Sequence, residues 1–91
     1  MSIFLVILQI SDSNRQSQMV SFIKENRPWA RITQNVWCIR EEDGKKTADI
    51  RDALNSKLPL QSSERLMVMN ISQSTWASYN LPKEVADWLK E

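Results

Sequence analysis

The chain has 91 residues, of which 42% are hydrophobic and 25% are charged, and its net charge is +1. This length predicts a single domain over residues 1–91, and the near-neutral charge argues against a strongly basic nucleic-acid-binding protein. The lack of histidine excludes a zinc site or a Ser-His-Asp catalyst, and the single glycine, Gly44, excludes a glycine-rich phosphate loop.

The N-terminal segment Ser2–Ile10 contains an unbroken apolar run from Ile3 to Leu8. The run is too short for a membrane span, which needs about 20 apolar residues. It also lacks the basic start and the cleavage site of a secretion signal. Both alternating sets of its side chains are apolar, which predicts a strand buried on both faces. Because Cys38 is the only cysteine, we expect a protein of the reducing cytoplasm, without a membrane association.

A capping cluster at residues 11–14 predicts that a helix follows over about Arg15–Asn26, with Met19, Phe22 and Ile23 on one apolar face. Pro28 ends this helix. Residues 29–33 and 36–40 predict a hairpin with a tight turn at residues 34–35, followed by a solvated loop over residues 41–46.

Thr47 is the expected cap of a second helix, whose apolar stripe is Ile50, Ala53, Leu54 and Leu58. Residues 65–71 predict the last strand. The tail over residues 72–91 has a tryptophan-led loop and a short helix that Pro82 opens, since the first turn of a helix tolerates proline.

The order of elements, β-α-β-β-α-β with a short C-terminal helix, predicts an α+β, ferredoxin-like fold with an antiparallel sheet. We expect the first and last strands, which are the most apolar, to lie in the middle of the sheet. Two helices cover only one face of such a sheet, so the tail or a second copy of the chain must cover the other. We therefore predict a homodimer that the tail helps to join, with interface residues Trp76, Leu81, Val85, Trp88 and Leu89.

Four segments, residues 35–39, 47–54, 64–68 and 76–89, resemble the SinR-like small proteins of bacteria and phages, whose role is unknown. The tryptophan-led tail is the most specific of the four. The SinR-like proteins are similar in fold to the small CRISPR-associated adaptation protein and to the VapD toxin. The resemblance therefore implies a ferredoxin-like fold and a setting in defence or in a toxin–antitoxin system.

In the CRISPR-associated and VapD relatives, an aspartate at the end of the first strand is tied to metal-dependent nuclease activity. This chain has Leu8-Gln9 there, and a neutral amide cannot supply the anionic oxygens that hold Mg²⁺. Asp12 is the remaining candidate for a catalytic residue. Mg²⁺ is expected as a cofactor only if the chain is such a nuclease; otherwise we expect no cofactor and no metal site.

We favour a non-catalytic, homodimeric assembly or regulatory module that has a protein partner. One alternative is a metal-dependent endoribonuclease of the VapD type, which would use Asp12 with a loop acid. The other is a nucleic-acid-binding dimer, because basic residues gather near Trp29 and Trp37. The residues expected to bind nucleic acid are Arg31, Arg40, Lys45 and Lys46. The neighbouring acids of residues 41–43 would repel phosphate.

Overall fold

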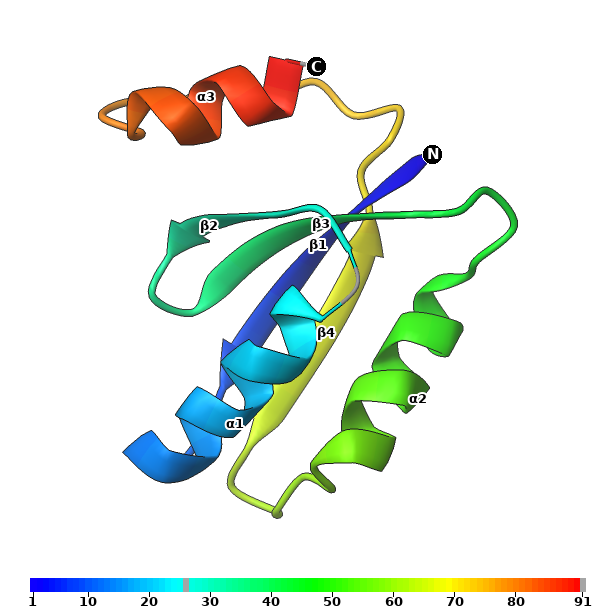
Figure 1. Ribbon diagram of the computed structural model, residues 1–91, viewed down its shortest axis with the longest axis vertical. Helices are drawn as coiled ribbons and strands as arrows, with labels where there is room; N and C mark the ends of the chain where they lie inside the picture. Colours follow the sequence, from blue (N-terminus) through cyan, green and yellow to red (C-terminus); the bar gives the residue numbers. More distant parts are fainter. Residues whose placement is uncertain (26, 91) are drawn as a thin grey trace.

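The computed structural model describes residues 1–25 and 27–90 (Figure 1). Its elements are β1 (Ser2–Gln9), α1 (Ser13–Lys24), β2 (Trp29–Thr33), β3 (Val36–Glu41), α2 (Thr47–Lys57), β4 (Arg65–Asn70) and α3 (Lys83–Lys90). The four strands form one antiparallel sheet. This confirms the predicted α+β, ferredoxin-like fold with a short C-terminal helix. Within the described ranges, none of the helices is long and apolar enough to cross a membrane.

The strand order is β2-β3-β1-β4, so the two central strands are β1 and β3. The prediction that the last strand would be central was wrong. β3 pairs with one side of β1, where Phe4 lies opposite Ile39, and β4 can then pair only with the other side, where Val6 lies opposite Val68. β4 is therefore an edge strand, although its sequence is as apolar as that of a central one.

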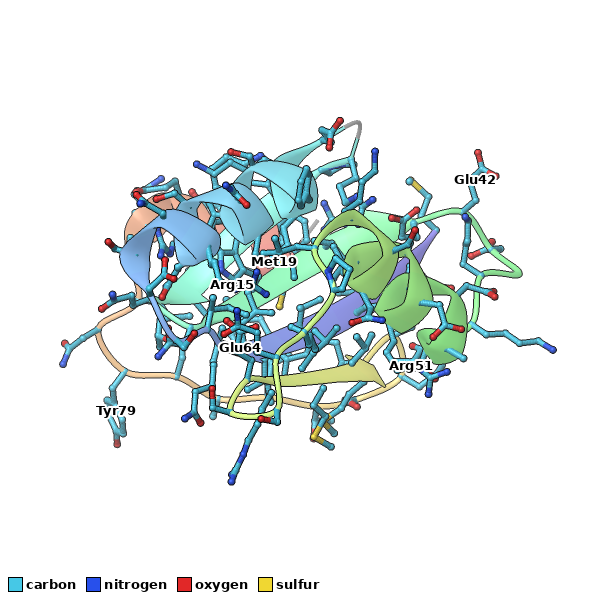
Figure 2. The ribbon with its side chains drawn as sticks, turned by 90° about the horizontal axis from the view of Figure 1, so that it is seen from below. Arg15, Met19, Glu42, Arg51, Glu64 and Tyr79 are labelled. Atoms are coloured by element: carbon cyan, nitrogen blue, oxygen red, sulfur yellow. The ribbon has the colours of Figure 1, made fainter. Side chains whose placement is uncertain are left out.

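The core lies between the sheet and the two helices α1 and α2, which cover the same face (Figure 2). On this face, β1 contributes Phe4, Val6 and Leu8, and β3 contributes Trp37 and Ile39, all of them buried. The helices supply the side chains that pack on them, namely Met19, Ile23, Ile50, Leu54 and Leu58. Ala53, which we expected in the apolar stripe of α2, is exposed.

Both long helices begin with a side-chain contact at the N-terminus. α1 starts at Ser13, two residues earlier than predicted, because the Asp12 carboxylate accepts a hydrogen bond from the Arg15 N–H at 2.9 Å. It ends at Lys24, and Asn26, the predicted last residue, lies outside the described residues. In α2, Lys46 rather than Thr47 is the capping residue, and its N–H donates to Asp49 at 2.9 Å.

The tail leaves the end of β4 and crosses to α3, which packs against β2 on the side of the sheet away from α1 and α2 (Figure 1). The Ile71 N–H donates to the Ile3 carbonyl at 2.9 Å and fixes the start of the tail to β1. The Pro82 carbonyl accepts the N–H of Ala86 at 3.0 Å, and so closes the first turn of α3. We call the sheet face that carries α1 and α2 the helix face, and the opposite one the tail face.

Candidate functional site

The C-terminal end of β1 has Gln9, followed after two residues by Asp12. Gln9 is exposed and lies opposite Arg65 of β4. The Asp12 carboxylate holds the first turn of α1 through the Arg15 N–H. The role of Asp12 as the N-terminal cap of α1 therefore explains its position.

The most elaborate polar cluster in this region is centred on Glu64, which comes from the loop before β4. The Glu64 carboxylate is buried and forms a two-pronged ion pair with Arg15, at 2.9 Å from Nε and 2.7 Å from Nη2 (Figure 2). It also accepts the Ser11 N–H at 3.1 Å, the Ser11 hydroxyl at 3.0 Å and the Gln61 N–H at 2.9 Å. These donors, with the Arg15 guanidinium foremost, hold the pKa of Glu64 far below its usual range.

The Glu64 cluster joins the end of β1, the start of α1 and the loop before β4. Five donors fill the acceptor positions of a carboxylate, which leaves little capacity for a ligand. Arg15 is committed as well, since its Nη2 also donates to the Pro59 carbonyl at 2.8 Å. We interpret this cluster as a structural clamp. Sequence reasoning missed it because Arg15 and Glu64 are 49 positions apart and no spacing pattern links them.

Three further acids have local partners. Glu41 pairs with Arg27 at 3.2 Å and Asp43 with the N-terminal amine at 3.4 Å. Asp52 pairs with Arg51 at 2.8 Å, and this guanidinium lowers the pKa of the Asp52 carboxyl. Across residues 1–25 and 27–90, no group of three or more histidine, cysteine, aspartate or glutamate side chains is placed to hold a metal ion. The endoribonuclease alternative therefore gains no support from their arrangement.

The predicted nucleic-acid-binding residues do not converge on one surface. Arg31 lies opposite Trp37, so it is on the helix face, where its guanidinium stacks on the Trp37 ring at 4.7 Å. Arg40 lies on the tail face and stacks on Trp88 at 4.0 Å. Lys45 and Lys46 are exposed in the loop that leads into α2. A single strand of nucleic acid would have to cross the sheet to reach all four.

The residues predicted to form an interface pack instead on the tail face of their own sheet. Val85 is buried, and Leu81, Trp88 and Leu89 are half-buried. The Arg40 Nη2 also donates a hydrogen bond to the Trp88 carbonyl at 2.6 Å. Trp76 is the exception, since about half of its side chain, 46%, is exposed. The tail, one of the two candidates for covering this face, therefore covers part of it.

Beneath the tail lies an apolar hollow of about 240 Å³. Leu5, Ile32 and Cys38 of the sheet form its floor, and residues of the tail from Ile71 to Leu89 form its wall. Burial raises the pKa of the Cys38 thiol to about 11, so this thiol stays protonated and unreactive. Among the described residues, none of the side chains that line the hollow is charged.

The β1–β4 half of the tail face has less cover. Met67 and Met69 of β4 are 55% and 41% exposed, and in the ladder they lie opposite Ile7 and Leu5 of β1. We call Ile7, Met67 and Met69 the methionine strip. It is an apolar patch on the surface, and it is the strongest candidate for a functional site.

Comparisons of the chain with family models, with curated proteins and with solved structures found no match.

Proposed function

We propose that this protein is a non-catalytic assembly module that forms a homodimer through the methionine strip. The exposure of Met67 and Met69 is the observation that carries the proposal. Methionine is flexible and polarisable, and surfaces rich in it adapt to partners. A domain of this size buries only roughly 60% of the surface of its unfolded chain, so covering this strip adds stability that the single chain does not have. The resemblance to SinR-like proteins adds a setting in defence or in a toxin–antitoxin system.

A symmetric dimer places the same strip of both copies at the interface. In each copy, β4 is an edge strand and the strip lies partly on it, so a partner that covers the strip also shields that edge. Trp76 extends the apolar surface towards the tail, because it lines the hollow next to Leu5. Exposed aromatic and methionine side chains are typical anchors of such interfaces.

The experiment is a measurement of molar mass by light scattering at micromolar concentration. We expect twice the mass of the single chain for the wild type. The double variant Met67→Lys with Met69→Lys is expected to be monomeric, because dimerisation would bury its charges without partners. Gln18→Lys, which places one positive charge on the exposed side of α1, is the control and should remain a dimer. A wild-type protein that is monomeric at these concentrations contradicts the proposal.

A further inference from the structure

The edge of the sheet formed by β2 has free backbone groups. The Arg40 N–H donates to the Pro28 carbonyl at 3.1 Å, so Pro28 faces β3. Residues of an antiparallel strand alternate between facing their partner strand and facing away. Ala30 therefore also faces β3, while the N–H and C=O groups of Trp29 and Arg31 point away from the sheet. β2 is the last strand on this side (Figure 1).

Two hollows flank this strand edge, one on each face of the sheet. The hollow on the helix face, about 310 Å³, lies between α1 and the β2–β3 turn; it is lined by Ser13, Gln16, Ser17, Val20, Arg31 and Gln34. The hollow on the tail face, about 400 Å³, lies between β2 and α3, and Trp29, Ala30, Pro82, Val85 and Trp88 are among its lining residues. Arg31 borders both hollows, so the outward backbone of β2 runs between them.

The chemistry of the two sides differs. The helix face carries two cations, the Arg31 guanidinium and the Lys24 amine, and the Lys24 amine lies 4.6 Å from the Trp29 ring. Neither cation has an ion-pair partner among the described residues. Serine and glutamine side chains add hydrogen-bond donors there, and no acid of residues 1–25 and 27–90 lines that hollow. On the tail face, Ala30, Val85 and Trp88 make the lining mainly apolar, although Glu84 also contributes to it.

We propose that the β2 edge binds an extended segment of a partner protein as an added antiparallel strand, in which carboxylate and apolar side chains alternate. Residues directly opposite each other in an antiparallel pair have their side chains on the same face. The segment's residues opposite Trp29 and Arg31 therefore point to the helix face, where two cations favour carboxylates. The residues of the segment that alternate with these point to the other face, towards the apolar hollow beside α3. Main-chain hydrogen bonds supply affinity, and the two hollows supply selectivity.

This site is separate from the methionine strip, because β2 and β4 are opposite edges of the sheet. The experiment uses the peptide acetyl-Thr-Glu-Val-Glu-Val-Glu-Thr-amide and follows the backbone amide chemical shifts of the whole chain. We expect shifts centred on residues 29–33 at about 1 mM peptide. The monomeric variant with lysines at the methionine strip should bind equally well, which distinguishes this proposal from the proposed dimer.

Two N-methylated peptides give a matched test of the geometry. Methylation of the glutamate nitrogens removes the N–H groups that would face Trp29 and Arg31, and it should abolish binding. Methylation of the valine nitrogens affects N–H groups that point to solvent, and it should leave binding intact. If both methylated peptides bind as tightly as the parent, the proposal is refuted.

Arg31→Gln should weaken binding of the glutamate peptide about tenfold, the equivalent of one charge-assisted hydrogen bond. Arg51→Gln, which removes an exposed arginine on α2, is the control and should have no effect. A peptide with lysine in place of glutamate should bind more weakly than the parent. The proposal is overturned if the parent peptide shifts no amide of β2, or if a short oligothymidylate shifts these amides while the peptide does not.

Discussion

Replacing Trp88 with alanine is expected to release α3 from the sheet while the core beneath it stays folded. Truncating a fully buried tryptophan costs about 3–5 kcal/mol. Trp88 is half-buried, so the lost apolar contact should cost about half of that, roughly 2 kcal/mol. The stacking on Arg40 at 4.0 Å adds about 0.5–1 kcal/mol. The sum, about 2.5–3 kcal/mol, raises the fraction of molecules with α3 undocked roughly 100-fold.

The released helix should also melt. α3 has eight residues, and helices shorter than about 12 residues are marginal in water without packing. Amide hydrogen exchange measures both effects, because exchange in α3 should accelerate while exchange in β1 and β3 changes little. Lys83→Ala is the control, since it breaks only the exposed pair with Asp87 at 2.9 Å, and it should cost less than about 0.5 kcal/mol. Unchanged exchange in α3 would refute the reasoning, as would equal acceleration in β1.

Three further predictions concern single side chains. Because the pKa of Glu64 is lowered in the folded chain, its ion pair stabilises the fold above the usual glutamate pKa of 4.5, and this contribution is lost as the pH falls below that value. Urea denaturation at a series of pH values should show this loss for the wild type and a flatter profile for Glu64→Gln. The Cys38 thiol, with a pKa of about 11 under the tail, should resist iodoacetamide in the wild type and react faster in Trp88→Ala; equal rates would mean that the tail does not shield it. Asp12→Ala should cost about 1 kcal/mol of stability through loss of the α1 cap, whereas Asp12→Asn should cost far less. Cleavage of labelled RNA with Mg²⁺ that both Asp12 variants abolish would instead support the endoribonuclease alternative.

The element pattern was predictable because it depends on local periodicity. The apolar run of β1 and the 3.6-residue spacing in α1 report which side chains share a face. The turn at residues 34–35 reports where the chain reverses. The same alternation holds in β3, where Trp37 and Ile39 lie in the core, while Cys38 and Arg40 point to the tail face. The need for a cover on the tail face followed from the same alternation, since β1 is apolar on both sides.

Periodicity carries no information on which elements are neighbours, and the tertiary structure decided those questions. It placed β3, rather than β4, in the centre of the sheet with β1. β3, which forms the hairpin with β2, occupies one side of β1 and leaves only the outer side of β1 for β4. It also brought Arg15 to Glu64 and docked Trp88 on Arg40, contacts between residues 49 and 48 positions apart. The sequence alone determined that the tail face needs a cover. The fold decided that the tail covers the β2–β3 half and leaves the methionine strip exposed, because the length and path of residues 71–82 set where α3 can dock.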